Sequence, residues 1–204
     1  KMTKGVYLII HTACTAYEGL SVFSPYLVGQ NTYQISMSVF TATAENKIPK
    51  IINCSSMARY GEQEVVPFTE DLIPKPQDPY GIAKYASEQT LDVMSNVHNF
   101  DYVNLVPHNI IGPRQKYDDP YRNVVSIMIN RILNGKPPII YGDGSQERCF
   151  SDIDDVVDPI VKSINSTNAI GETINIGPDE DVITIKDLAF KILKVLNSDL
   201  EPIF

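Results

Sequence analysis

The residues with the clearest chemical potential are Ser56, Tyr80 and Lys84. Tyr80 and Lys84 are four residues apart, so on a helix their side chains share one face. An ammonium near a phenol stabilises the phenolate and lowers a tyrosine pKa that is otherwise about 10. Such a tyrosine can take up and return the proton of a sugar or alcohol hydroxyl, and the Ser56 hydroxyl can hold the same substrate oxygen.

A Tyr-x-x-x-Lys pattern alone is a weak signal, because the chain contains 11 tyrosines. The stronger signal is the serine pair Ser55-Ser56. It lies in the stretch 53–61, follows the end of an apolar run and precedes Tyr80. Together the two stretches predict acid–base chemistry on a hydroxyl group.

The surrounding pattern predicts how these residues are positioned. Continuous apolar runs are typical of strands buried on both faces of a parallel sheet, and the runs alternate with segments of helical periodicity. Strands are expected at 6–10, 48–54 and 102–106, helices at 31–46 and 80–97, and loops at 17–25 and 61–78. This order predicts an α/β fold with a doubly wound parallel (Rossmann-type) sheet. Ligands of such sheets bind at the carboxyl ends of the strands, where His11 and Ser56 fall.

Beyond residue 110 the order of the expected helices and strands changes. We expect helices at 121–134 and 184–197 and strands at 138–141 and 172–176, with Thr184 as an N-cap and Asp187 in a partial capping box. The chain is therefore divided into 1–110, which holds Ser56, Tyr80 and Lys84, and 111–204, mainly a small α/β substrate-binding lobe with segments that return to the sheet.

Composition limits the partners. The 204 residues carry 25 acidic and 17 basic side chains, a net charge of −8, which argues against nucleic acid or an anionic membrane as a partner. No apolar run approaches the roughly 18 residues of a membrane span, and no signal peptide is evident. Cys14, Cys54 and Cys149 have no zinc-like spacing, so no metal site is expected. We expect these cysteines to be buried thiols in a reducing cytoplasm.

Several motifs in a fixed order resemble the extended short-chain dehydrogenase/reductase family, and within it nucleotide-sugar epimerases of the UDP-glucose 4-epimerase type. They are Ile10-His11-Thr12-Ala13, Ser55-Ser56-Met57-Ala58-Arg59-Tyr60-Gly61, Asp78-Pro79-Tyr80-Gly81-Ile82-Ala83-Lys84, Pro107-His108-Asn109-Ile110-Ile111-Gly112-Pro113-Arg114-Gln115, the stretch 141–148, Asp154-Asp155-Val156-Val157 and Asn175-Ile176-Gly177.

The resemblance implies NAD as the cofactor and a nucleotide sugar as the substrate. It makes Tyr80 the acid/base, Lys84 the residue that lowers its pKa and holds the nicotinamide ribose, and Ser56 the partner of the sugar hydroxyl. Hydride leaves sugar C4, a 4-keto sugar rotates, and hydride returns to the opposite face. The implied cofactor-binding residues are His11, Thr12, Ala13, Asn31, Cys54, Ser55, Tyr80, Lys84, Pro107 and His108.

The same resemblance places Ser56, Met57, Asn109, Asn123, Val124, Tyr141 and Arg148 at the substrate. Arg148 suits a bidentate phosphate contact, against a surface ion pair with Asp152 as the alternative. Tyr141 could equally be a core residue, His108 an ordinary loop histidine, and Asn31 a structural bridge.

The three residues directly after Ser56 predict the reaction type. Resembling dehydratases and decarboxylases carry acidic residues there, whereas Met57, Ala58 and Arg59 cannot serve as a carboxylate acid/base. The absence of acidic residues at these positions favours a 4-epimerase of a nucleoside diphosphate sugar, most simply a UDP-hexose. Another nucleotide-sugar oxidoreductase, such as a 4-ketosugar reductase or a dehydratase, is the alternative. Arg59 either meets a charged substrate or has a surface or loop-anchoring role.

One family feature is missing from the sequence. The Gly-x-x-Gly-x-x-Gly loop that holds the pyrophosphate has no counterpart, and the chain opens at what matches the family's fourth strand, roughly 60 residues in. We therefore expect an interior piece of a longer enzyme, with a non-catalytic sugar-nucleotide-binding relic as a second hypothesis. A homodimer through the helices around 31–46 and 80–97 is also implied by the resemblance.

Overall fold

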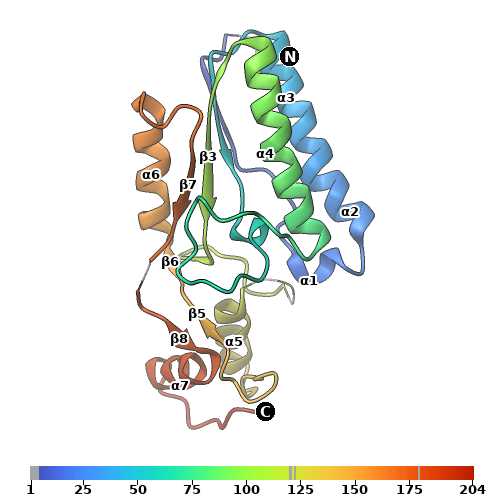
Figure 1. Ribbon diagram of the computed structural model, residues 1–204. Helices are drawn as coiled ribbons and strands as arrows, with labels where there is room; N and C mark the ends of the chain where they lie inside the picture. The colour runs from blue at the N-terminus through green and yellow to red at the C-terminus, as the bar shows by residue number, and fades with distance from the viewer. Residues whose placement is uncertain (1–4, 120, 122, 179) are drawn as a thin grey trace. The chain divides into compact units, whose positions relative to one another are not determined.

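The computed structural model describes residues 5–119, 121, 123–178 and 180–204. The chain forms two compact units, residues 1–108 with 155–176 and residues 109–154 with 177–204. The first unit is built on four parallel strands in the order β1-β2-β3-β7 (Figure 1). These are β1 (Leu8–His11), β2 (Lys50–Cys54), β3 (Asp101–Pro107) and β7 (Thr173–Ile176).

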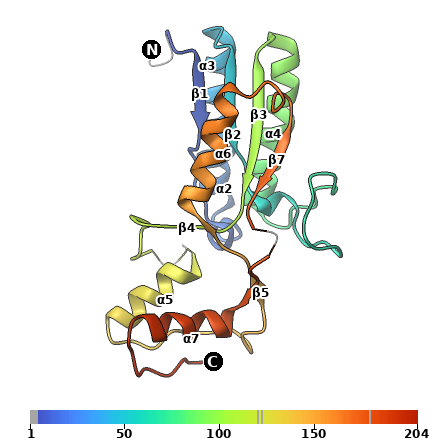
Figure 2. The same cartoon turned by 90° about the vertical axis from the view of Figure 1, so that its left-hand side faces the viewer.

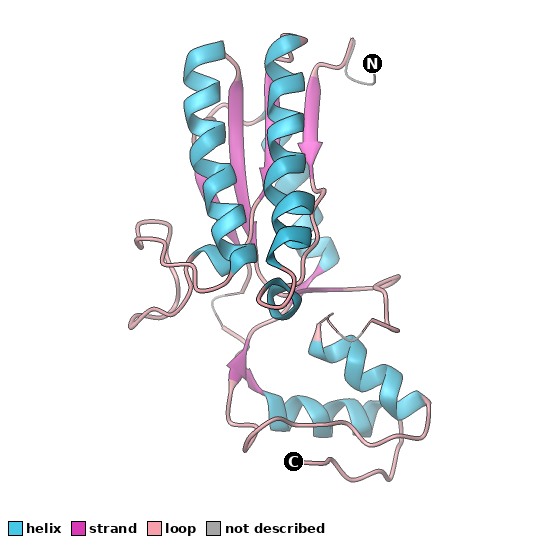
Figure 3. Cartoon of the chain, turned by 90° about the vertical axis from the view of Figure 1, so that its right-hand side faces the viewer, coloured by secondary structure: helices cyan, strands magenta, loops and turns pink. Residues whose placement is uncertain are grey.

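Helices cover both faces of this sheet. Helices α3 (Ile35–Glu45) and α4 (Pro79–His98) lie side by side on one face, and α6 (Ile153–Asn165) lies on the other (Figures 2 and 3). Between the sheet and the first pair lies a core made of Phe40, Ile51, Leu91, Phe100 and Tyr102. The predicted doubly wound α/β fold is confirmed.

Helix α4, which carries Tyr80 and Lys84, has capping residues at both ends. The Asp78 carboxylate accepts hydrogen bonds from the backbone N–H groups of Tyr80 (2.9 Å) and Gly81 (3.0 Å). Pro79 takes the first helical position, where its missing N–H costs nothing. Asn99 adopts the left-handed conformation (φ 56°) that commonly ends a helix.

Helix α6 was not predicted. Pro159 and three aspartates give the segment the composition of a loop, although its valines and isoleucines follow helical spacing. Its carboxyl end is held by the Lys50 ammonium, which donates to the carbonyls of Ser163 (2.7 Å), Ile164 (3.1 Å) and Ser166 (3.2 Å). A cation at this position is favoured by the helix dipole.

Two predictions for the start of the chain are wrong. The first strand is not buried on both faces in the described chain, because Ile10 is 42% exposed. The expected loop 17–25 contains the short helix α1 (Glu18–Ser21) and the start of α2 (Pro25–Gly29). The chain then continues through one π-helical turn, η1 (Gln30–Gln34), into α3, so the predicted helix starts earlier than residue 31.

The second unit packs α5 (Val124–Leu133) against α7 (Ile185–Val195). Strand β4 (Ile110–Ile111) pairs with β6 (Ser151–Asp152), and β5 (Glu147–Arg148) pairs with β8 (Ile183–Thr184). Its core consists of Met128, Ile132, Ile140, Leu188, Ala189, Ile192 and Leu193. The predicted N-cap is confirmed, because Thr184 Oγ1 accepts from the Asp187 N–H at 3.0 Å.

The predicted strand at 138–141 is wrong. Ile139 forms only an isolated bridge with Ile203, and its neighbour Ile140 packs into the core of this unit. The short strands β4, β5, β6 and β8 were not predicted, because two residues give no readable periodicity.

The three cysteines are free thiols. Each is partly exposed, which corrects the expectation that they are buried. No helix within the described ranges combines the length and the hydropathy that a membrane crossing requires.

Candidate active site

Ser56 lies just beyond the carboxyl end of β2, at the start of a 3₁₀ turn, η2 (Met57–Arg59). Its Oγ accepts a hydrogen bond of 3.2 Å from the Ala58 N–H, so the serine caps the turn. Met57 is the first residue of the turn and is half-buried. The sequence therefore places the serine at the edge of the sheet where parallel α/β folds bind ligands.

Tyr80 and Lys84 are one turn apart on α4, and each is only 5% exposed. The Lys84 Nζ donates a hydrogen bond of 2.7 Å to the carbonyl of Cys54, the last residue of β2. The same Nζ lies 5.9 Å from the centroid of the Tyr80 ring. Helix α4 and strand β2 thus bring the three predicted residues to one place.

The Tyr80 side chain is buried. Burial raises its pKa well above that of a free phenol, and the nearby Cys14 and Glu18 raise it further. Only the hydrogen bond with Ser56 opposes this change. Burial is the largest cause of this change in the chain by itself, and the expectation that Lys84 lowers the pKa of Tyr80 stays a prediction.

Cys14 and Glu18 were missed by the sequence prediction, although both act on the Tyr80 hydroxyl. They come from the segment after β1, 62 or more residues before Tyr80 in the chain. The only available signal was that Cys14 comes soon after a strand end, the position where site residues collect in such sheets.

His11 is the last residue of β1 and is 5% exposed. Its Nε2 is 3.0 Å from Ser36 Oγ, and its ring meets the Phe40 ring edge-on. Burial, together with the Lys84 charge, lowers the pKa of His11 to about 4. The imidazole is therefore neutral at physiological pH, and its contacts are structural ones.

The other residues predicted for the cofactor also belong to the first unit. Thr12 and Ala13 are exposed directly after β1, and Asn31 is half-buried in the π-helical turn. Ser55 is buried, and its Oγ donates to Glu88 Oε1. Pro107 ends β3, and the His108 N–H donates to the Ile176 carbonyl at 2.9 Å.

Arg59 is neither at the surface nor on the solvent side of the turn. It is 7% exposed, and its Nε lies 3.1 Å from Glu88 Oε2. The predicted surface role is thus wrong, and the anchoring alternative agrees with the geometry. Glu88 was not predicted, although its spacing of four residues from Lys84 places both on one face of α4.

The remaining predicted substrate residues lie in the second unit. Asn109 donates to the Cys149 carbonyl (3.0 Å), and Asn123 caps α5 through the Val125 N–H (2.9 Å). Val124 packs against the core of this unit. Tyr141 is 80% exposed, so the alternative that it is a core residue is wrong.

Arg148 is also exposed. Its Nη1 donates to the Glu147 carbonyl at 2.7 Å, and among the described residues it forms no ion pair with Asp152. The alternative of a surface ion pair therefore has no support, and the guanidinium is available to an incoming anion.

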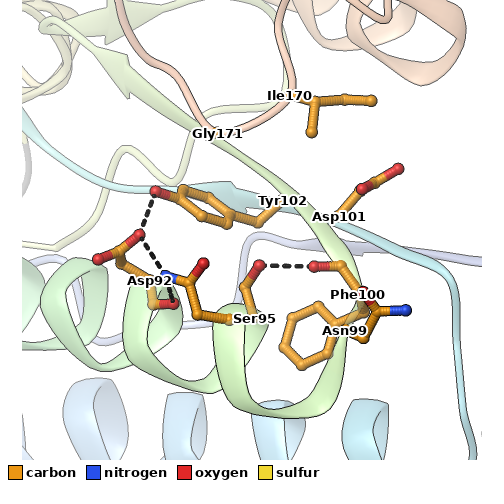
Figure 4. A pocket seen from close by; sticks show the side chains of 9 residues that line it. Asp92, Ser95, Asn99, Phe100, Asp101, Tyr102, Ile170 and Gly171 are labelled. Atoms are coloured by element: carbon orange, nitrogen blue, oxygen red, sulfur yellow. Dashed lines mark hydrogen bonds between the residues drawn. The ribbon is translucent and has the colours of Figure 1, made fainter.

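A pocket of the first unit lies elsewhere. A pocket of about 350 Å³ is lined by the end of α4, the start of β3 and the loop before β7 (Figure 4). Inside it the Tyr102 hydroxyl donates to Asp92 Oδ1 at 2.9 Å. Since Asp101 begins β3, this pocket is at the amino ends of the parallel strands and not at the Ser56 edge.

A doubly wound parallel sheet with a serine, a tyrosine and a lysine gathered at its carboxyl edge defines a Rossmann-type protein with a dehydrogenase-like site. Residues 1–177 match the model of the NAD dependent epimerase/dehydratase family, and the chain belongs to that family.

Named relatives agree with this assignment. The UDP-glucose 4-epimerase of Mycolicibacterium smegmatis is 32% identical over 160 residues, which are 77% of this chain and 50% of that protein. A UDP-N-acetylglucosamine 4-epimerase from Methanobrevibacter ruminantium M1, solved with UDP-N-acetylmuramic acid, superposes with a TM-score of 0.91 at 34% identity, covering 99% of this chain and 64% of that one.

The UDP-glucuronic acid 4-epimerase of Bacillus cereus, solved with UDP-glucuronic acid and NAD, has a TM-score of 0.88 at 27% identity, covering 98% of this chain and 63% of that one. The chain thus spans less than two thirds of the length of these proteins.

The residues present fit the family's cofactor, NAD. An ammonium has three N–H donors, and the Cys54 carbonyl takes one of those on Lys84. The others suit the hydroxyls of a ribose. Thr12 and Ala13, directly after β1, are exposed at the same edge of the sheet.

Proposed function

We propose that the protein containing this chain is an NAD-dependent 4-epimerase of a nucleoside diphosphate sugar, most simply a UDP-hexose. The observation that carries the proposal is that Ser56, Tyr80 and the buried Lys84 ammonium lie together at the carboxyl end of β2, with no carboxylate in the turn after Ser56. Epimerisation needs one acid/base, whereas dehydration and decarboxylation need a second.

Glu88, a carboxylate near the serine pair, does not supply that second group, and Glu18, which acts on the Tyr80 hydroxyl, lies outside the turn after Ser56. Both oxygens of Glu88 are engaged, Oε1 by Ser55 and Oε2 by Arg59. This favours epimerisation over dehydration in the first unit.

Each residue then has a defined task. When bound, NAD supplies the acceptor and donor of hydride for sugar C4. Ser56 Oγ holds the sugar hydroxyl against the Tyr80 hydroxyl, and Tyr80 takes its proton and later returns it. A second cation near the phenol lowers its pKa, so the positive charge of a bound nicotinamide together with Lys84 opposes the effect of burial.

In the second unit, we assign the nucleotide half of the substrate to Asn109, Asn123, Val124, Tyr141 and Arg148. An exposed guanidinium is suited to two parallel hydrogen bonds with a diphosphate, and an exposed phenol ring is suited to stacking on a base.

The test uses the complete protein. It is incubated with UDP-glucose, UDP-N-acetylglucosamine, UDP-glucuronic acid and their 4-epimers, and the anomeric signals are followed by NMR. We expect interconversion of at least one pair without added redox equivalents. Absence of interconversion with every pair would remove the epimerase proposal. Net consumption of NADH with a 4-keto sugar would favour the reductase.

We also propose that the protein forms a homodimer through α3 and α4. On α4, Ile82 (54% exposed), Val93 (60%) and Val97 (71%) leave apolar surface open to solvent. Sedimentation velocity of the complete protein tests this, and a strictly monomeric species at micromolar concentration would contradict it. An intact mass consistent with a longer chain would separately decide between the enzyme and the sugar-nucleotide-binding relic.

A further inference from the structure

A buried ion pair joins the turn that carries Ser56 to the helix that carries Tyr80 and Lys84. The side chains of Arg59 and Glu88 are 8% and 5% exposed, with Arg59 Nε 3.1 Å from Glu88 Oε2. The guanidinium also lies over two tyrosine rings, 4.9 Å from the centroid of Tyr60 and 5.6 Å from that of Tyr85.

The other oxygen of Glu88 reaches the serine pair. Ser55 Oγ donates to Glu88 Oε1, and Ser55 immediately precedes Ser56. The Ser55 backbone is fixed as well, since its N–H donates to the Leu105 carbonyl of β3 at 2.7 Å. Glu88 therefore contacts both ends of the segment 55–59, through Ser55 at one end and Arg59 at the other.

The middle of this segment touches the same helix. A Cβ placed on Gly81 would lie 2.5 Å from the Ala58 carbonyl oxygen, so the turn rests directly on the backbone of α4 beside Tyr80. The turn is thus held against α4 at Gly81 and again two helical turns further on at Glu88.

A buried ion pair is weak evidence for stability, because the cost of desolvating two charges can exceed their attraction. Burial accordingly raises the pKa of Glu88, while Arg59 and Ser55 lower it. What the pair provides is a fixed geometry between two elements, and the reaction depends on that geometry because Ser56 and Tyr80 must contact one substrate oxygen.

We infer that Arg59 and Glu88 are positioning residues: the pair fixes the Ser55–Arg59 turn on α4 and thereby sets the Ser56 hydroxyl against the Tyr80 hydroxyl. This inference rests on the proposed epimerase function. Neither side chain is assigned a contact with the substrate, so substrate affinity depends little on them.

The test uses the complete protein with four variants: Glu88→Gln, Arg59→Met, Arg59→Lys and the double variant Arg59→Met/Glu88→Met. For each we would measure kcat and KM for the nucleotide sugar, the melting temperature, and amide hydrogen exchange of Ala58, whose N–H donates to Ser56 Oγ. A displacement of reacting groups by about 1 Å costs up to about a hundredfold in rate.

We expect both charge-removing single variants to lose about tenfold to a hundredfold in kcat, with KM changed by less than about threefold. Arg59→Lys, which keeps a cation for Glu88, should recover part of the loss in kcat. The double variant should recover melting temperature, because no unpaired charge stays buried, yet keep the low kcat because Ser55 has lost its acceptor. Exchange at Ala58 should be faster in every variant that lacks the pair.

A double variant in which kcat recovers together with melting temperature would overturn the inference and leave the pair a structural one. The exchange measurement separates this failure from that of the proposed function. If the wild-type protein epimerises no nucleotide sugar, the epimerase proposal fails. In that case unchanged exchange at Ala58 in the variants would overturn the positioning role as well, and faster exchange would support the fixed turn.

Discussion

The Lys84 ammonium donates a hydrogen bond of 2.7 Å to the Cys54 carbonyl at the end of β2. This bond joins α4 to the sheet at the strand end that leads into Ser56. It also fixes the ammonium of a side chain that is 5% exposed, 5.9 Å from the Tyr80 ring centroid. A flexible lysine is thereby given one position.

Replacing Lys84 with an uncharged side chain of similar size tests the role of its charge. Lys84→Met keeps the volume of the stem but leaves the Cys54 carbonyl without its donor, which costs about 1–3 kcal/mol of stability. In the complete protein we expect kcat to fall at least about a hundredfold, because the phenol loses its nearby cation. Steady-state kinetics and urea unfolding measure the two effects. The exposed Lys191→Met is the matched control, and an equal loss there would contradict the assignment.

Tyr80→Phe removes one oxygen and leaves the packing of the ring. We expect turnover to fall by about 10²- to 10⁴-fold while NAD binding persists, because only the acid/base group is lost. Isothermal titration with NAD and the NMR epimerisation assay measure the two quantities. Tyr7→Phe, at a tyrosine that is 72% exposed, should change neither. Near-normal turnover of Tyr80→Phe would remove Tyr80 from its assigned role.

Gly81→Ala should separate the Ser56 turn from α4. The added Cβ would meet the Ala58 carbonyl oxygen at 2.5 Å, so the backbone must shift, at a cost of about 1–3 kcal/mol. Gly29→Ala is the control, since nothing lies within 4 Å of its added Cβ and its helical conformation favours alanine by about 0.4–1 kcal/mol. Chemical unfolding of both variants tests this. Equal stability of the two would contradict the close contact.

His11 predicts a dependence of stability on pH. Its pKa is lowered to about 4 in the folded chain, so between its unfolded value of 6.5 and 4 the unfolded state binds a proton that the folded state does not. The contribution of His11 to the free energy of unfolding is therefore constant above pH 6.5. It falls as the pH drops from 6.5 to 4 and is constant again below pH 4. The loss is roughly 3 kcal/mol.

Urea unfolding across this pH range measures the slope for His11. His11→Asn, which keeps a side-chain amide near Ser36 but does not titrate, should reduce the slope. An identical slope in the variant would assign the effect to other groups.

The N-cap of α7 is the fifth prediction. Thr184 Oγ1 accepts from the Asp187 N–H at 3.0 Å, so Thr184→Ala should destabilise the second unit by about 1 kcal/mol. Thr41→Ala, at an exposed site within α3, should be neutral or slightly stabilising because alanine has the higher helix propensity. Thermal unfolding distinguishes the two, and an equal effect would contradict the capping role.

Some of the molecule was predictable because its signals are local. The strands β2 and β3 follow from apolar runs, and α4 follows from Asp78, Pro79 and helical periodicity. The shared face of Tyr80 and Lys84 follows from their spacing alone. Helix α6 could have been found from its apolar spacing, but Pro159 and the aspartates obscured it.

The sequence by itself determined the class of fold, the family, and which side chains could carry acid–base chemistry, because periodicity and motif spacing are properties of neighbouring residues. The tertiary structure decided the state of those groups. The pKa of Tyr80 is raised by burial and by Cys14 and Glu18, and the buried Arg59 is paired with Glu88 of another element. Burial and charge act through space between segments far apart in the chain, so spacing along the sequence does not determine them.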